Sequence, residues 1–228
     1  MSQAELQRLL AIESELKSNL SSPRPDTLVF LNDAMARLRE ISFQVEPARR
    51  VECLLSIAQQ FYHQGQSVFS GVEPAALAVM LAADTGDKAL QRKSLTFQGI
   101  ILSQTNNPGD ALLSLAEGLR LAEELRDTLS IASVWNALGA AFYEAALYAD
   151  ARQCYERAHF LAAEDENLRY VAAVSLSNAA ICCLHVNALR DGIERIGKAI
   201  ALMPAPSSPA ELLVRVFAEG TFIRLLLL

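Results

Sequence analysis

Covalent or metal chemistry in this chain would have to come from its four cysteines and three histidines. No two cysteines form a C-x-x-C pair, and no histidine stands at zinc-ligand spacing from a cysteine. Cys182 and Cys183 are adjacent, and neighbours on a helix point about 100° apart, so we do not expect them to pair. We expect no metal and no cofactor, and we expect the thiols to be small apolar side chains. The residues concerned are Cys53, Cys154, Cys182, Cys183, His63, His159 and His185.

Motifs for catalysis are missing as well. The sequence has no glycine-rich phosphate loop and no G-x-S-x-G, and neither His63 nor His185 has a carboxylate three or four residues away. We therefore expect no enzymatic activity from this chain, although a domain beyond Leu228 could be catalytic.

Charge and hydropathy exclude further classes of partner. The 20 basic residues against 26 acidic ones give a net charge of −6, and the only dense basic spots are Arg49-Arg50 and Arg92-Lys93, so we expect no nucleic-acid partner. The amphipathic N-terminus carries acids and has no apolar signal core. No stretch approaches about 18 uninterrupted apolar residues. These features predict a cytoplasmic location and no membrane partner.

The elements that position these residues are predicted to be helices. With 52% hydrophobic residues but only 10 Gly and 8 Pro, the chain has too few turn residues for an all-β fold. Apolar residues recur every three or four positions almost throughout, which indicates an all-α chain of about eleven helices joined by short loops. Two leading helices are predicted at Ser2–Leu20 and Asp26–Phe43, with Asp26 as a cap, and Pro47 starts the next helix.

The sequence resembles itself at a shift of about forty residues. Gly139 falls on Gly99 and Ala151 on Ala111, while a forward shift of forty-one places Gly139 on Ala180. Each matched position keeps its size class. This regularity predicts a repeated helical hairpin.

The unit from Ser133 to Asp165 resembles a tetratricopeptide repeat, whose pattern is W-x-x-L-G-x-x-Y, then A-x-x-x-F, then a late Pro. The resemblance implies a right-handed superhelical solenoid of antiparallel hairpins, with longer repeats as in arrays of bacterial signalling and regulatory proteins. Small residues let the two helices of a hairpin approach each other closely, and large apolar residues fill the space between one hairpin and the next hairpin. The packing residues are Trp135, Leu138, Gly139, Phe142, Ala151, Tyr155, Ala158, Gly99, Ala111, Ala180, Gly192, Ala199 and Pro204.

The repeats divide the chain into three predicted parts. Residues 1–46 form a leading helix pair that caps the stack, residues 47–207 form four hairpins, and residues 208–228 form the first helix of a truncated fifth hairpin. Because a terminal repeat needs a polar outer face and this one ends in Arg224 and four leucines, we expect either a chain cut inside a repeat array or an end covered by a partner.

In this family the first helix of each hairpin lines a concave groove that takes extended or helical peptides. Asn136 and Asn178 are expected to hydrogen-bond a ligand backbone, with apolar pockets from Phe97, Ile100 and Tyr143. Alternatively, the same residues only pack against the next helix. Lys93 and Arg224, the only groove-side bases, are too far apart for the terminal-carboxylate clamp of chaperone-docking relatives. The predicted groove residues are Gln60, His63, Lys93, Phe97, Ile100, Asn136, Ala140, Tyr143 and Asn178.

The resemblance implies a non-catalytic scaffold that binds a protein or peptide. We expect it to be the N-terminal sensory or interaction region of a larger bacterial signalling protein, for example ahead of a diguanylate cyclase or a DNA-binding domain. One alternative is a homodimer through the C-terminal helix, using Phe217, Phe222, Ile223 and the terminal leucines. Another is a small-molecule sensor with a pocket inside the superhelix.

Overall fold

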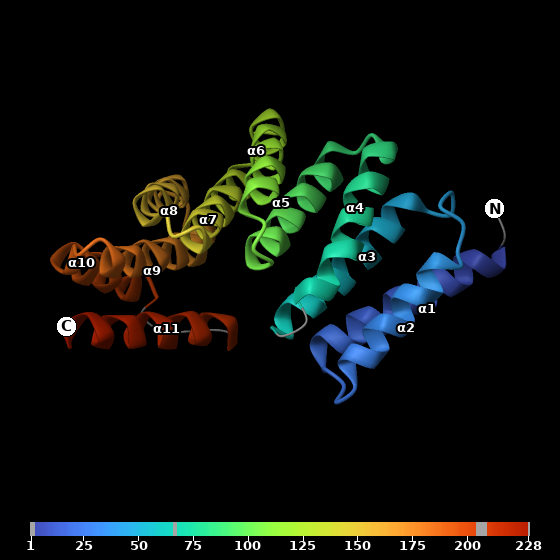
Figure 1. Cartoon of the computed structure of the whole chain (residues 1–228), viewed down its shortest axis with the longest axis horizontal. Coiled ribbons are helices and arrows are strands. Elements are labelled where there is room, and N and C mark those ends of the chain that lie inside the picture. Colours follow the sequence, from blue (N-terminus) through green and yellow to red (C-terminus); the bar gives the residue numbers. More distant parts are fainter. Residues whose placement is uncertain (1–2, 66–67, 204–208, 228) are drawn as a thin grey trace. The chain divides into compact units, whose positions relative to one another are not determined.

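The chain is helical throughout the part that the computed structural model describes, which is residues 3–65, 68–203 and 209–227, with backbone only for residues 209–211, 213 and 214. Those residues form eleven α-helices and two 3-10 helices and contain no strand, which confirms the all-α prediction (Figure 1). The elements are α1 (Gln3–Ser21), α2 (Thr27–Arg39), α3 (Pro47–His63), η1 (Val68–Gly71), α4 (Val72–Thr85), α5 (Lys88–Gln104), α6 (Pro108–Glu124), α7 (Thr128–Glu144), α8 (Tyr148–Ala162), η2 (Glu166–Leu168), α9 (Arg169–His185), α10 (Leu189–Ala201) and α11 (Pro209–Leu226).

The chain divides into two compact units, residues 1–121 and residues 122–228, and the boundary falls inside α6. Unit 1 and unit 2 are described separately below. The division into 1–46, 47–207 and 208–228 follows the sequence repeat and stays a prediction.

The five consecutive helices α3 to α7 each end on a single residue in the left-handed backbone region. Gly65, Gly86, Asn106, Arg126 and Ala146 follow each other at steps of 20 or 21 residues, all with φ between 53° and 71°. After Asn106, Arg126 and Ala146 the next amide along the chain donates to a carbonyl five residues back, Asn107 to Leu102, Asp127 to Ala122 and Leu147 to Phe142. This is the Schellman bond that satisfies the last carbonyls of a helix. Two such ends make one hairpin of about forty residues, so the backbone repeats with the sequence.

Aspartates begin several helices. The Asp87 side chain accepts hydrogen bonds from the amides of Ala89 and Leu90, and Asp127 accepts one from the amide of Ser130. Asp26 stands at the N-cap position of α2 but makes no such side-chain bond, so its predicted capping role is not realised. Pro47 starts α3 as predicted.

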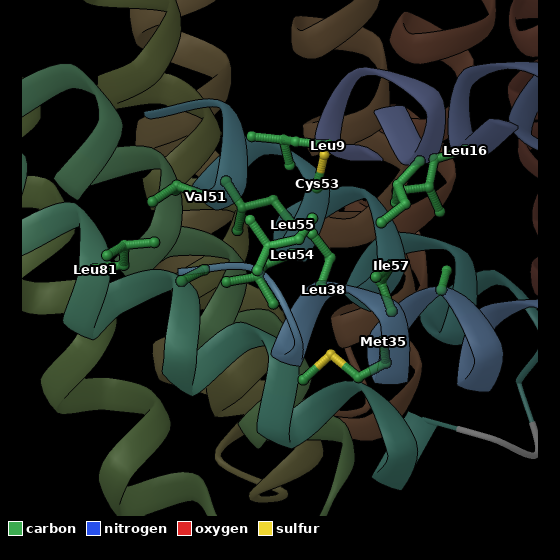
Figure 2. Close-up of a cluster of buried hydrophobic side chains, with 14 of the residues drawn as sticks. Leu9, Leu16, Met35, Leu38, Val51, Cys53, Leu54, Leu55, Ile57 and Leu81 are labelled. Carbon is green, nitrogen blue, oxygen red and sulfur yellow. The ribbon is translucent and has the colours of Figure 1, made fainter. Parts of the chain in front are cut away.

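Unit 1 has a core formed by α1 to α5, with α3 at its centre. The helix α3 packs against α1, α2, α4 and α5. Figure 2 shows the cluster, in which Leu9 and Leu16 of α1 meet Leu38 of α2 and Ile57 of α3. These four side chains are at most 1% exposed, so α1 and α2 cover one side of α3. The leading helix pair therefore belongs to the hydrophobic core of unit 1.

Glycine allows the helices of a hairpin to cross closely. In unit 1, a methyl group at Gly99 would lie 2.5 Å from Cγ of Leu115, sixteen residues later. In unit 2, a methyl group at Gly139 would lie 2.6 Å from the ring of Tyr155, again sixteen residues later. Real Cβ atoms do not approach that closely, so only glycine fits. The predicted small-on-large pattern thus corresponds to the hairpin crossing.

The other predicted packing residues are buried or half-buried. Five of the alanines have no exposed surface: Ala111, Ala151, Ala158, Ala180 and Ala199. A Cβ added to Gly192 would lie 3.1 Å from Cβ of Cys183. Leu138 is buried, while Trp135 and Phe142 are half-buried. Pro204 lies outside the described residues.

All four thiols are buried, and we expect them to be chemically silent in the folded chain. Burial raises the pKa of Cys53 and Cys182 to about 12 and that of Cys154 to about 11, and it also raises the pKa of Cys183. Because the thiolate is the reactive form, a thiol reagent at pH 8 should modify none of the four within the time that it modifies free cysteine. In denaturant all four should react. Rapid modification of the native protein would contradict this expectation.

Two segments, Val68–Thr85 and Glu166–His185, are long and apolar enough to cross a membrane by length and composition alone. Both lie in helices that pack on neighbours within their own unit, α4 against α3 and α5, and α9 against α8 and α10. A helix in a packed core passes the same test.

Candidate functional site

Unit 2 has an open pocket bordered by α7, α8, α9 and α11, which we call the unit 2 groove. Its volume is about 340 Å³. Two of its residues, Tyr143 and Asn178, are predicted groove residues. The lining consists of Tyr143, Tyr155, Asn178, Ile181, Leu184, Phe217, Thr221 and Arg224.

Two amide side chains meet beside this pocket. The Nδ2 of Asn178 donates to Oδ1 of Asn136 at 3.3 Å, and the Ser175 hydroxyl donates to the same oxygen at 3.3 Å. Among the described residues, nothing bonds to Nδ2 of Asn136 or to Oδ1 of Asn178. Both side chains are half-buried. The pair therefore offers one donor and one acceptor that are free for a ligand, and a peptide bond presents the complementary two.

Three rings gather at the C-terminal ends of α7 and α9. The Tyr143 hydroxyl and Nε2 of His185 are 3.1 Å apart, and the ring of Tyr148 stacks on His185 with centroids 4.0 Å apart. Tyr143 meets Tyr148 edge-on at 5.4 Å. Burial raises the pKa of Tyr143, so its hydroxyl stays protonated at neutral pH. These contacts hold the Tyr143 ring in place at the pocket.

The helix α11 supplies the fourth side of the groove. Thr221 is buried, Phe217 and Arg224 are exposed, and Arg224 is the single charged residue in the lining. Arg224 makes no ion pair with any described residue. The floor is Tyr155 of α8, which is 4% exposed. The pocket thus combines apolar walls with a few polar groups, an arrangement common in binding sites.

Gln60 is placed differently from the expectation that it lines an open groove. It is 4% exposed, its Oε1 accepts from Nδ2 of Asn19 at 2.6 Å, and its Nε2 donates to the carbonyl of Leu16 at 3.1 Å. Both ends of the side chain are therefore used by α1. Gln60 borders a pocket beside His63, but both of its polar ends are already bonded to α1, so it offers a ligand no free group.

The other predicted groove residues of unit 1 fall into two pockets: Lys93 and Phe97 line one of about 250 Å³, and His63 lines a second together with Gln60. His63 is exposed beside a pocket of about 250 Å³ that also includes Pro23. Lys93 is exposed and forms an ion pair with Glu52 of the neighbouring α3. Phe97 and Ile100 are half-buried, and the Phe97 ring packs edge-on to Tyr62 at 6.3 Å.

Of the residues that line the unit 2 groove, Thr221 was missed from the sequence, while Tyr155 was assigned to repeat packing and Phe217 to a dimer contact. Thr221 lies forty residues after Ile181 and Ile181 forty-one after Ala140, so the repeat shift carried to the last helix would have placed Thr221 in the groove. The same shifts carry Tyr143 to Leu184 and then to Arg224. Tyr148, which stacks on His185 beside the groove, gave no such signal, because it stands on the second helix of its hairpin. Ala140 itself is half-buried on α7 and does not line the pocket.

Metal ligands do not converge in the part of the chain described. Within it, no group of three or more His, Cys, Asp or Glu side chains could hold a metal ion. The Nδ1 of His159 is 3.2 Å from the carbonyl of Ala172, and burial lowers the pKa of His159. That histidine is bound to backbone, so it has a structural contact of its own.

Comparison with known proteins identifies the fold. Neither a protein-family model nor a curated protein matches the sequence. The structure is similar to the crystal structure of BtubC from P. vanneervenii, with a TM-score of 0.64 and 15% identity over 91% of this chain and 96% of that one. It is also similar to a kinesin light chain-type protein from Podosopora anserina with nearly identical TPR-like repeats, at a TM-score of 0.62 and 16% identity over 79% and 86% of the two chains.

A third solved structure is larger than this chain. It is a signal transduction ATPase with numerous domains from Pyrococcus horikoshii that has a tetratricopeptide repeat sensor. This chain matches it over 96% of its own length and 34% of that protein, with a TM-score of 0.67 and 14% identity. At these identities the likeness shows the fold alone. The predicted all-α, tetratricopeptide-type repeat fold is confirmed.

Proposed function

We propose that the chain is a non-catalytic scaffold that binds a protein or peptide segment in the unit 2 groove. The observation that carries the proposal is the free donor of Asn136 and the free acceptor of Asn178 beside an apolar pocket. A segment that lays its backbone on the two amides could insert one apolar side chain between Ile181, Leu184 and Phe217. Backbone bonds would give affinity for many sequences, and the pocket would select among them.

Replacing both amides, Asn136→Ala with Asn178→Ala, is expected to weaken binding of groove ligands about tenfold or more, because two hydrogen bonds to the ligand are lost. Peptides selected by the native chain from a random peptide display library are the probe, and fluorescence anisotropy measures their affinity. The matched control replaces two exposed amides elsewhere, Asn32→Ala with Gln153→Ala, and should leave affinity unchanged. Equal binding by native chain and double variant would place the site elsewhere.

We further propose that this scaffold is a cytoplasmic sensory or interaction region of a bacterial signalling protein. The likeness to the signal transduction ATPase, in which a tetratricopeptide repeat unit is the sensor, supports the sensory role alone, and the bacterial and cytoplasmic parts of the proposal rest on the sequence resemblance and composition. The reading frame that contains this chain provides the test. An output domain in the same frame, such as a diguanylate cyclase or a DNA-binding domain, would support the proposal, and its absence would count against it.

A further inference from the structure

Two adjoining pockets of unit 1 form a second hollow, which we call the unit 1 cavity and which extends from Leu20 of α1 to Phe97 of α5. The pockets have volumes of about 220 and 250 Å³. They have Leu55, Gln59 and Lys93 in common, so they form one continuous space across α1, α3 and α5. Every residue that lines this space belongs to unit 1, and none of them lines the unit 2 groove.

The floor of the unit 1 cavity is apolar from one end to the other. Leu16 of α1 and Leu55 of α3, both labelled in Figure 2, are 1% and 5% exposed. Phe97 is half-buried at one end, and Leu20 is 46% exposed at the other. A ligand that covers this floor removes apolar surface of the protein from water.

An extended peptide backbone would find few partners on this floor. The Ser56 hydroxyl accepts a bond from Nε2 of Gln60, and the Thr96 hydroxyl donates to the carbonyl of Arg92. Each residue of an extended peptide needs both a donor and an acceptor, and leaving them unpaired is costly. A hydrocarbon chain needs neither, so the floor favours a hydrocarbon chain.

One positive charge of the cavity lacks a counter-ion. Lys17 pairs with Glu13 at 2.5 Å. Lys93 pairs with Glu52 at the same distance. Arg92 has no ion pair with any described residue, and its Nε is buried without a hydrogen-bond acceptor in that part of the chain. An anion in the cavity would compensate this charge.

The groups around Arg92 fit a carboxylate. A guanidinium presents paired N–H groups to the two oxygens of a carboxylate, and the Gln59 amide, which bonds to no described residue, can donate a further hydrogen bond. The backbone that holds Arg92 is tightly packed. A Cβ added to Gly118 of α6 would lie 3.0 Å from Oγ1 of Thr96 and 3.8 Å from the carbonyl oxygen of Arg92.

We propose that the unit 1 cavity binds a small carboxylate with a long apolar tail, of the chemical class of a medium-chain fatty acid. The carboxylate contacts Arg92 and Gln59, and the tail follows Leu55 toward Leu20. This site is additional to the peptide-binding role of the unit 2 groove and does not depend on it. Because the ligand contacts α1, α3 and α5 only when they are packed together, binding also stabilises unit 1.

Isothermal titration calorimetry of the whole 228-residue chain with sodium dodecanoate, kept below its micelle concentration, tests the proposal. We expect saturable binding at one site with a Kd in the micromolar range. Dodecyltrimethylammonium has a similar tail but a positive head, and it should bind at least tenfold more weakly. Butanoate has the head with little tail, and it should show no measurable binding.

Variants of the head-group site separate charge from packing. Arg92→Gln should weaken dodecanoate binding about tenfold, because a charged hydrogen-bond donor is lost, whereas Arg92→Lys should keep most of the affinity. Gln59→Glu should weaken binding at least as much, because the new carboxylate pairs with Arg92 and repels the ligand. The matched control is Arg8→Gln, an exposed arginine of α1 outside the cavity, which should leave the affinity unchanged.

The path of the tail has its own test. Leu20→Asp places a charge at the far end of the floor and should weaken dodecanoate binding about tenfold, while the shorter octanoate should be unaffected. Absence of saturable dodecanoate binding by the native chain would overturn the proposal. Equal affinity of the native chain and Arg92→Gln, or no effect of Leu20→Asp on dodecanoate, would also contradict it. Binding of acidic peptides that requires Arg92, without binding of dodecanoate, would make the cavity a peptide site instead.

Discussion

Replacing Gly139 with valine is expected to lower the free energy of unfolding of unit 2 by about 3 kcal/mol, the upper end of the usual effect of overfilling a packed core. A Cβ at this position would lie 2.6, 2.7 and 2.9 Å from three atoms of the Tyr155 ring. The ring is rigid and 4% exposed, so it cannot turn aside. The hairpin crossing between α7 and α8 would have to open.

Trp135 provides the measurement, because it is the sole tryptophan and lies on α7 beneath the guanidinium of Arg157. Its fluorescence during urea unfolding follows this hairpin. Gly197→Val on α10 is the control, since nothing lies within 4 Å of a Cβ there, and it should change stability by no more than about 0.5 kcal/mol. Adding Tyr155→Leu to Gly139→Val should recover part of the loss. Equal stability of the Gly139 and Gly197 variants would refute the close crossing.

Replacing Gln60 with alanine is expected to destabilise unit 1 by about 3 kcal/mol, because an unsatisfied buried amide and a cavity both add to the cost. The change removes the acceptor of Asn19, which is 2% exposed, and the donor to the Leu16 carbonyl. Urea unfolding followed by far-ultraviolet circular dichroism measures the loss of helix. The variant Gln64→Ala, one turn later and exposed, should be within about 0.5 kcal/mol of the native chain.

A double-mutant cycle separates a structural from a binding role for Gln60. Asn19→Ala combined with Gln60→Ala should cost clearly less than the sum of the two single changes, because each single change strands the other amide. If Gln60→Ala left stability intact and abolished peptide binding instead, the original prediction that Gln60 faces a ligand would stand.

Regular packing could be predicted from the sequence because it depends on local patterns. Apolar spacing gave the helices, and size classes repeated at forty residues placed Gly99 and Gly139 at the hairpin crossings. In the first hairpin the forty-residue shift from Gly99 predicts Gln59 as the residue at the helix crossing. In the structure Ala58 lies at the crossing instead, and its carbonyl oxygen would be 3.3 Å from a Cβ added to Gly71. The 3-10 helix η1 lies between α3 and α4 there and disturbs the register.

Contacts made by parts outside the repeat could not be predicted in this way. Gln60 was assigned to the groove because it occupies a groove position of its repeat, but α1 has no counterpart in the other hairpins and covers it. The stacking of Tyr148 on His185 joins two hairpins, and no periodic rule relates those residues. The amide pair of Asn136 and Asn178 was predicted as two residues that share a function, and the structure brings them into contact.

The left-handed residues that end the helices bear on how the chain folds. At Arg126 and Ala146 this conformation is adopted without glycine, at a local cost of about 1–2 kcal/mol each. The chain near those turns would therefore prefer to stay open unless the helices on both sides are already packed. A single hairpin cut from the array should be largely unstructured in isolation. Folding is then expected to be cooperative across neighbouring hairpins. When one hairpin unfolds, the hairpins packed against it in the same unit lose their support and should unfold next.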